Sequence, residues 1–213
     1  MIAIVDYGMG NLRSVQKALE RVGSRAIVTD DPAVLERAQG VLLPGVGAFG
    51  DAMDSLRSRR LLAPVLRQVA DGKPLLGICL GMQLLFDESE EMGRHQGLGL
   101  LPGRVVRFPK GDLRVPHVGW NEFRQVRGDL LAGIVDGAYA YFVHSYFAMP
   151  AEPMDVLATT EYGLEFAAVV GRSSVYGAQF HPEKSQEVGL QLLKNFVRLV
   201  DKEQHGDDHI PGD

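Results

Sequence analysis

Cysteine is almost absent from this sequence, which has one, Cys79, among 213 residues. A single cysteine excludes an intrachain disulfide, and it also excludes a zinc site built from several cysteines. We therefore expect the fold to be held together by its hydrophobic core, and the protein to work in a reducing cytoplasm.

The sequence also lacks targeting signals, long apolar runs and basic clusters. Residues 1–6 have neither the basic start nor the apolar stretch of a signal peptide, so they predict a first strand. No segment approaches the roughly 20 apolar residues of a membrane span. The net charge is −5 and lysines and arginines form no run, so nothing indicates nucleic-acid binding. We expect a cytoplasmic protein with no membrane or nucleic-acid partner.

The first half of the chain alternates between strand and helix signals. Hydrophobic residues make up 46% of the 213 residues, enough for the core of one large α/β domain. Apolar runs predict strands, and amphipathic or capped segments between them predict helices. The predicted strands are 2–5, 26–28, 40–43 and 74–78; the predicted helices are 11–22, a short one from 32, 61–69 and 81–86. This alternation predicts a mainly parallel sheet with helices on both faces.

The second half is richer in strand signals. The predicted strands are 104–108, 140–146, 156–160, 166–170 and 175–180, with a hairpin turn at 171–174 and a last helix at 186–200. The predicted fold is thus a single three-layer α/β domain over residues 1–200, with a parallel central sheet and an added antiparallel part. Residues 201–213 are polar, and we expect a disordered tail there.

Cys79 lies where a predicted strand meets a predicted helix. It is flanked by Gly77 and Gly81, the pattern of a nucleophile elbow, in which a sharp turn requires small neighbours. The turn places the thiol at a helix N-terminus, where the helix dipole favours the thiolate. A buried, inert cysteine is the alternative interpretation.

A cysteine nucleophile needs a base, and His181 has the most suitable surroundings of the six histidines. It follows the strand-like run 175–180, and catalytic groups gather beyond the carboxyl ends of parallel strands. Pro182 stiffens the turn, and Glu183 can hold the imidazole in the required tautomer. For a single histidine, a structural or surface role is the alternative.

Two segments together resemble class I glutamine amidotransferases, and the resemblance covers about residues 1–200. The segments are Gly77-Ile78-Cys79-Leu80-Gly81-Met82-Gln83 and His181-Pro182-Glu183. The resemblance implies that Cys79 attacks the side-chain amide of glutamine and forms a thioester, with release of ammonia. It implies His181 as general acid/base and Glu183 as the residue that orients it, with no cofactor and no metal.

Further segments resemble one branch of this family, the glutaminase subunits of imidazole glycerol phosphate synthases. They are residues 6–12, 44–49, 116–121, 141–146 and 181–185. This resemblance implies a heterodimer with a TIM-barrel cyclase, which receives the ammonia for histidine biosynthesis. Glutaminases that serve anthranilate or guanylate synthesis share the triad, but they tend to differ in the glycine loop and lack the segment around Trp120.

The resemblance and the local sequence also suggest which groups hold the reacting atoms. The backbone amide of Leu80 is suited to bind the oxyanion, and the resemblance favours the amide of Val46 as a second donor. A simple strand–helix turn is the alternative for residues 45–47. The resemblance further implies that L-glutamine contacts Gln83, Glu91, Ser145 and Tyr146. The alternatives are a helix-surface position for Gln83 and a solvated acidic run for Glu91.

The resemblance assigns Asn11, Trp120 and Lys184 to the surface that contacts the cyclase. Packing of the only tryptophan in the core is the alternative for Trp120. Three other functions stay open at this stage: a glutaminase for another synthase, a free-standing cysteine hydrolase, and a non-catalytic regulatory module.

Overall fold

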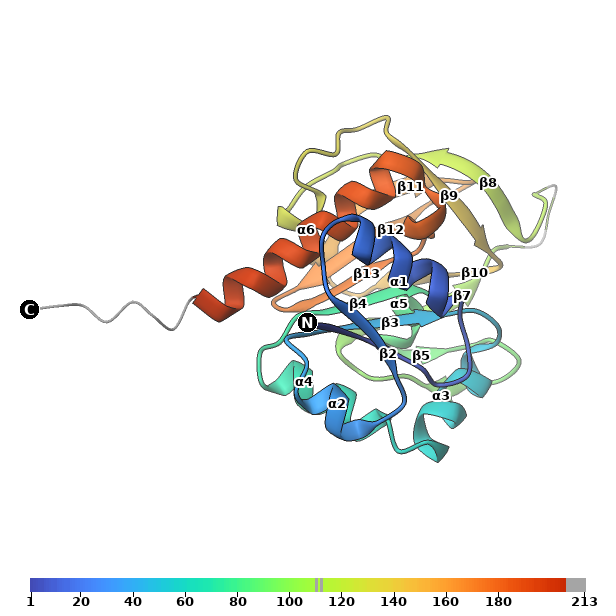
Figure 1. The fold of residues 1–213 in the computed structure, drawn as a ribbon. Coiled ribbons are helices and arrows are strands. Elements are labelled where there is room, and N and C mark those ends of the chain that lie inside the picture. Colours follow the sequence, from blue (N-terminus) through green and yellow to red (C-terminus); the bar gives the residue numbers. More distant parts are fainter. Residues whose placement is uncertain (110, 112, 206–213) are drawn as a thin grey trace, which may run out of the picture.

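The computed structural model describes residues 1–109, 111 and 113–205, and its centre is a seven-stranded sheet (Figure 1). The strand order is β11-β12-β13-β4-β3-β1-β2. The five strands from β13 to β2 are parallel, whereas β11 and β12 extend the sheet antiparallel. The bounds are β1 (Ile2–Val5), β2 (Ala26–Thr29), β3 (Gly40–Gly45), β4 (Leu75–Cys79), β11 (Val156–Glu161), β12 (Glu165–Arg172) and β13 (Val175–Ala178).

Helices cover both faces of this sheet. On one face lie α1 (Leu12–Arg21) and α6 (Gln186–His205), and on the other lie α2 (Pro32–Glu36), α3 (Phe49–Ser58) and α4 (Leu62–Ala70) (Figure 1). Because strand side chains alternate, Ile2 and Ile4 pack on the first face and Ala3 and Val5 on the second. The predicted fold class, a mainly parallel sheet between helices with an antiparallel part, is confirmed.

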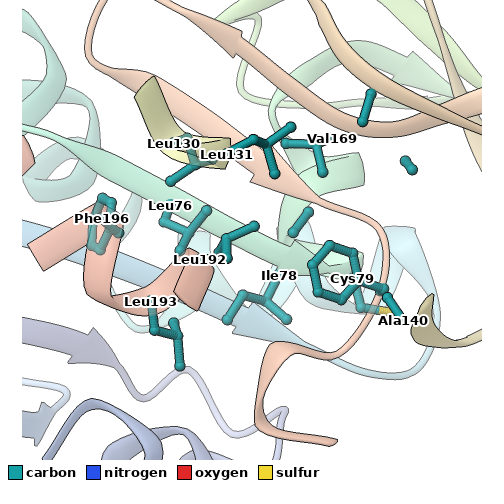
Figure 2. Packing of buried hydrophobic residues seen from close by; sticks show 14 of the residues in the cluster. Leu76, Ile78, Cys79, Leu130, Leu131, Ala140, Val169, Leu192, Leu193 and Phe196 are labelled. Atoms are coloured by element: carbon teal, nitrogen blue, oxygen red, sulfur yellow. The ribbon is translucent and has the colours of Figure 1, made fainter. Parts of the chain in front are cut away.

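The last helix packs against the core below the site. Leu192, Leu193 and Phe196 lie beside Leu76 and Ile78 of β4, and all five are buried (Figure 2). Burying one side chain of this size stabilises the fold by about 1.5–3 kcal/mol. The strand that ends at Cys79 is therefore anchored by its own buried residues.

Two smaller sheets complete the fold. One has the order β10-β7-β5-β6 and the other pairs β8 with β9. The bounds are β5 (Phe86–Ser89), β6 (His95–Gln96), β7 (Leu101–Arg107), β8 (His117–Glu122), β9 (Tyr139–His144) and β10 (Tyr146–Pro150). Short elements connect the strands: α5 (Leu80–Leu84), η1 (Asp129–Leu131), η2 (Pro153–Asp155) and η3 (Pro182–Lys184).

The predicted start of the short helix at residue 32 and the predicted hairpin at residues 171–174 are both confirmed. The carboxylate of Asp31 accepts a hydrogen bond of 2.8 Å from the amide of Ala33 and so caps α2. The predicted hairpin forms between β12 and β13, whose last pair, Arg172 and Val175, encloses a two-residue turn.

The segment 140–146 was predicted as one strand, and this is wrong. It forms the end of β9 and the start of β10, which belong to different sheets and are separated by Ser145. Residues 117–122 and 86–89 carry strands, β8 and β5, that we did not predict. The helix predicted over 81–86 is α5, which ends at Leu84. Strand β8 pairs with β9 across the intervening residues 123–138, so its local pattern alone does not reveal it.

Helix α3 was also missed, because its N-terminus is capped from a distance. The residue before it, Ala48, has no polar side chain, and the amide of Phe49 instead donates a 2.8 Å hydrogen bond to the carboxylate of Glu91. A cap supplied from 42 positions away leaves no local signal for a helix start.

Helix α6 extends to His205, so the first five residues of the predicted tail are helical. Residues 206–213 lie outside the described part of the chain, and the prediction of disorder for them is untested. Among the described helices, none combines the length and the apolar composition that a membrane crossing requires.

Gly81, the second residue of α5, allows the backbone of α5 to approach that of β3 very closely. A Cβ on Gly81 would overlap the carbonyl oxygen of Leu43 in β3. We expect Gly81→Ala to lower the free energy of unfolding by about 3 kcal/mol or more, because backbone atoms cannot move aside as a side chain can. Chemical denaturation measures this change.

Gly111→Ala is the matched control, since a Cβ there meets no atom within 4 Å. It should change the free energy of unfolding by less than about 0.5 kcal/mol. Equal effects of the two substitutions would contradict the close approach at Gly81.

Candidate active site

Strand β4 ends at Cys79 in a backbone conformation that non-glycine residues rarely adopt. Its φ is 54° and its ψ is −109°, and α5 begins at the next residue, Leu80. Such a conformation costs on the order of 1–3 kcal/mol and persists only where the surroundings impose it. The elbow geometry predicted for Cys79 is therefore present.

The two flanking glycines are required by space, as the elbow pattern predicts. A Cβ on Gly77 would lie 2.5 Å from the carbonyl oxygen of Gly81. On Gly45, at the end of β3, a Cβ would overlap the hydroxyl of Tyr7 and lie 2.9 Å from the Cβ of Leu80. Three glycines from two neighbouring strands and α5 thus bring the chain close together around the turn.

His181 lies beside Cys79 because β13 and β4 are parallel neighbours. Ala178 pairs with Ile78, so the residues after both strands emerge at the same edge of the sheet. The amide of His181 donates a 3.0 Å hydrogen bond to the carbonyl of Tyr141 in β9. The segment after β13 is therefore fixed to the antiparallel part of the molecule.

Glu183 orients the imidazole. Nδ1 of His181 and Oε1 of Glu183 are 2.9 Å apart, and the two side chains are only 4% and 2% exposed. An ionised carboxylate can only accept a hydrogen bond, so Nδ1 of His181 carries a proton. Nε2 is then the ring nitrogen available to Cys79. Nε2 makes no hydrogen bond to any of the described residues.

The charge on His181 depends on opposing effects. Burial lowers its pKa, but the neighbouring Cys79 and Glu183 outweigh burial and raise the pKa from 6.5 to about 9. The imidazole is thus suited to remain protonated at neutral pH.

A cavity of about 300 Å³ opens in front of Cys79. This volume lies at the lower end of the range for small-molecule sites, roughly 300–1,000 Å³. Its lining contains the predicted Cys79, Leu80, His181, Gln83, Glu91, Ser145, Tyr146, Val46 and Lys184, together with Gly47, Val143 and His144. Nine sequence-predicted residues from distant segments are therefore brought to one cavity.

Gln83 is a buried residue, which excludes the helix-surface interpretation. Its Nε2 donates hydrogen bonds of 2.8 Å to the carbonyl of Tyr146 and 3.0 Å to Oε1 of Gln179. Glu91 is not simply part of a solvated acidic run, because it lines the cavity and caps α3 through Phe49.

The loop after β3 reaches the cavity edge. The side chain of Val46 is 46% exposed, and Gly47 follows with a φ of 100°. Ser145 and Tyr146 lie where β9 gives way to β10, and the carbonyl of Ser145 accepts a 3.1 Å hydrogen bond from the amide of Phe108. Backbone groups of both segments therefore border the space in front of the thiol.

Three residues were expected at a partner surface. Asn11 is exposed before α1, and Trp120 is 46% exposed on β8, so Trp120 is not a core residue. Lys184 lines the active-site cavity, and its Nζ lies 5.9 Å from the ring centroid of Tyr141. Asn11 and Trp120 are thus exposed, and Lys184 and Trp120 both lie near the ring of Tyr141, which is 6.0 Å from that of Trp120.

The sequence did not single out two residues that the structure places at the site. Gln179 is fully buried; it accepts from Gln83, and its Nε2 lies 3.8 Å from Sγ of Cys79. The hydroxyl of Ser185 donates 2.7 Å to the carbonyl of His181 and accepts from the amide of Tyr141. A polar residue inside the apolar run 175–180 was the available signal for Gln179.

The described residues contain no group of three or more His, Cys, Asp or Glu side chains arranged to hold a metal ion.

Comparison with known proteins agrees with this geometry. The family described as glutamine amidotransferase class-I matches residues 3–200. The imidazole glycerol phosphate synthase subunit HisH of Syntrophotalea carbinolica is 56% identical over 204 residues, covering 92% of this chain and 98% of that protein. The subunit of the same name from Moorella thermoacetica is 58% identical over 201 residues, covering 93% and 95%.

Solved structures share the fold at lower identity. One described as a glutamine amidotransferase superimposes with a TM-score of 0.75 at 22% identity, covering 94% of this chain and 98% of the other. The structure of PurLQS from Thermotoga maritima gives a TM-score of 0.72 at 19% identity, covering 93% and 98%.

The pKa of His181 provides a test of this site. We expect Glu183→Gln to lower the pKa by about 1 unit or more, because an uncharged amide no longer favours the imidazolium. Histidine NMR titration measures it, with the His181 signal assigned by His181→Asn. Glu152→Gln, the same change at an exposed position, should leave this pKa unchanged.

The same pKa shift makes stability depend on pH. Because the folded pKa of about 9 lies above 6.5, His181 stabilises the fold fully below about pH 6.5, and this contribution is lost as the pH rises through about 9. The difference in free energy of unfolding between wild type and Glu183→Gln should therefore be larger at acidic than at alkaline pH. A difference that does not vary with pH would contradict the assignment.

Proposed function

The chain belongs to the class I glutamine amidotransferases, and from this we propose that it is the glutaminase subunit of an imidazole glycerol phosphate synthase. It hydrolyses L-glutamine to L-glutamate and ammonia. The observation that carries the proposal is the buried His181–Glu183 pair, whose histidine lines the same cavity as the elbow cysteine. The curated relatives at 52–58% identity support the choice of this synthase over others.

Cys79 is the nucleophile. Its sulfur forms a bond to the side-chain carbonyl carbon of glutamine, and the C–N bond of the amide breaks. His181 transfers a proton to the leaving nitrogen, so that ammonia departs and a γ-glutamyl thioester remains. Water then attacks the thioester; His181 accepts a proton from it, and the C–S bond breaks to release glutamate and leave the sulfur as a thiolate beside the imidazolium. Glu183 stabilises the imidazolium in both steps.

The oxyanion of each tetrahedral intermediate is bound by backbone amides. The amide of Leu80 opens α5 directly after the nucleophile, and a short helix leaves its first amides free to donate. The amide of Val46 is the second donor. This amide belongs to the peptide that joins Gly45 to Val46, and the glycine at position 45 allows that peptide to rotate with little steric hindrance from its own side chain.

Glutamine is held by other residues that line the cavity. The carboxylate of Glu91 binds the substrate ammonium, while its bond to Phe49 keeps it in place. Gln83 and the backbone at Ser145 and Tyr146 bind the rest of the substrate, consistent with their place on the cavity. No cofactor takes part in this chemistry, because a thiol and an imidazole supply both nucleophile and proton transfer.

The partner is the cyclase subunit of the synthase, a TIM barrel that forms a heterodimer with this chain. Ammonia passes directly to the cyclase, which makes imidazole glycerol phosphate and aminoimidazole carboxamide ribonucleotide for histidine biosynthesis. Asn11, Trp120 and Lys184 contribute to the contact, and exposure of Trp120 on β8 supports this. The location is the cytoplasm, where the catalytic thiol stays reduced, and neither nucleic acid nor membrane is involved.

Removal of the Cys79 thiol distinguishes synthesis that uses glutamine from synthesis that uses added ammonia. We expect Cys79→Ala to abolish synthesis from glutamine, at least 10³-fold, because no thioester forms. Synthesis from added ammonium salts should remain near the wild-type rate, measured by formation of imidazole glycerol phosphate. Loss of both activities would mean that Cys79 serves assembly instead of chemistry.

The exposed tryptophan tests the docking surface. Trp120→Ala should weaken binding to the cyclase about tenfold or more, as truncation of a central aromatic contact does. Met154→Ala is the matched control, because Met154 is 82% exposed and lies on η2, an element outside the β8–β9 sheet. Calorimetric titration measures both; equal affinities for the two variants would exclude Trp120 from the interface.

A further inference from the structure

Two buried histidines next to the active-site cavity have no part in the mechanism above. His117 of β8 and His144 of β9 face each other across the strand pair, and they are 3% and 6% exposed. Nδ1 of His117 lies 3.3 Å from Nε2 of His144. His144 also lines the cavity in front of Cys79, whereas His117 does not.

The direction of every hydrogen bond around this pair follows from one fixed acceptor. Nδ1 of His144 lies 2.8 Å from the carbonyl oxygen of Tyr146, which can only accept, so Nδ1 is the donor. Burial keeps both imidazoles neutral by lowering the pKa of His144 to about 3 and that of His117 to about 4. Nε2 of a neutral His144 then accepts, and His117 donates to it through Nδ1.

The chain of hydrogen bonds continues in both directions. Nε2 of His117 accepts from the amide group of Asn121, at 3.4 Å, and that amide also donates 2.8 Å to the carbonyl of Glu161. At the other end, the carbonyl of Tyr146 accepts from Gln83 as well as from His144. A single carbonyl is therefore shared by the buried histidine pair and by the cavity residue Gln83.

Packing alone does not require imidazoles at these positions. The rings of Phe108, Phe142 and Phe166 lie within 5.2–6.3 Å of His117 or His144, centroid to centroid. A phenyl ring would fit this aromatic cluster without any buried polar atom to satisfy. The feature specific to histidine is the donated hydrogen bond to Tyr146.

We propose that His144, held by His117, is a positioning residue for glutamine: it fixes the carbonyl of Tyr146 and thereby the side chain of Gln83. This inference rests on the proposed glutaminase function. His144 does not touch the reacting atoms in this account. Its removal should therefore weaken glutamine binding and leave the chemical step nearly unchanged.

The test uses the complex with the cyclase and measures kcat and KM for glutamine. We expect His144→Phe to raise KM roughly 5- to 10-fold, the size of one lost hydrogen bond, with kcat changed less than about twofold. His144→Asn keeps an N–H donor at the place of Nδ1, and KM should return to within about threefold of wild type. Inactivation of Cys79 by a glutamine-like diazo-ketone should respond in the same way. In His144→Phe the reagent should bind more weakly, while the maximal rate of inactivation stays at the wild-type value.

Phe166→Leu is the control for packing. It disturbs the same aromatic cluster, 5.2 Å from the ring of His144, without removing a hydrogen bond, so it should lower the unfolding temperature and leave KM unchanged. His117→Phe removes the donor to Nε2 of His144 and the acceptor of the Asn121 amide, but it leaves the bond from His144 to Tyr146 in place, so it should raise KM about two- to threefold. It also provides a test if His144→Phe does not fold.

The outcomes separate this inference from the proposed function. Equal KM values for His144→Phe, His117→Phe and wild type would overturn the positioning role. The same conclusion would follow if KM rose equally in His144→Phe, His144→Asn and Phe166→Leu. A wild-type complex that makes its product from ammonium salts but hydrolyses no glutamine would instead overturn the proposed function.

Discussion

The close approach of the backbone around Cys79 is the constraint on which the rest of the site depends. Gly45, Gly77 and Gly81 lie so near to neighbouring atoms that a Cβ on any of them would collide. This packing holds Cys79 at a φ of 54°, a conformation that would relax if the chain had room. The energy that maintains the strain comes from the buried strands and helices on both faces of the sheet.

The sheet then determines which groups meet the thiol. Parallel pairing of β13 with β4 brings His181 to the edge where Cys79 emerges, and pairing of β3 with β4 brings the loop of Val46 to the same edge. The antiparallel strands β9 and β10 supply the opposite wall, because the chain leaves one sheet at Ser145 and enters another. A glutamine-sized cavity forms where these three parts meet.

The polar residues around the cavity are connected to one another more than to solvent. Glu183 fixes His181, Gln179 joins Gln83 to Cys79, and Glu91 connects the cavity wall to the start of α3. Buried polar groups of this kind are costly unless they are satisfied, so each one restricts the position of the next. Strand β8 has a related arrangement, since Trp120 faces outward while His117 faces the aromatic cluster.

The sequence alone determined the class of fold and the chemistry of the site. Alternating apolar runs and helix caps predicted the parallel sheet, because side-chain periodicity is a local property. The glycine spacing around Cys79 and the His181–Glu183 pair predicted the elbow and its base, because each depends on residues two positions apart. The tertiary structure alone decided which distant groups complete the site: the cap of α3 by Glu91, the bonds of Gln83 and Gln179, and the division of residues 140–146 between two sheets. These features depend on strand pairing and contacts between residues up to about a hundred positions apart, which no local pattern encodes.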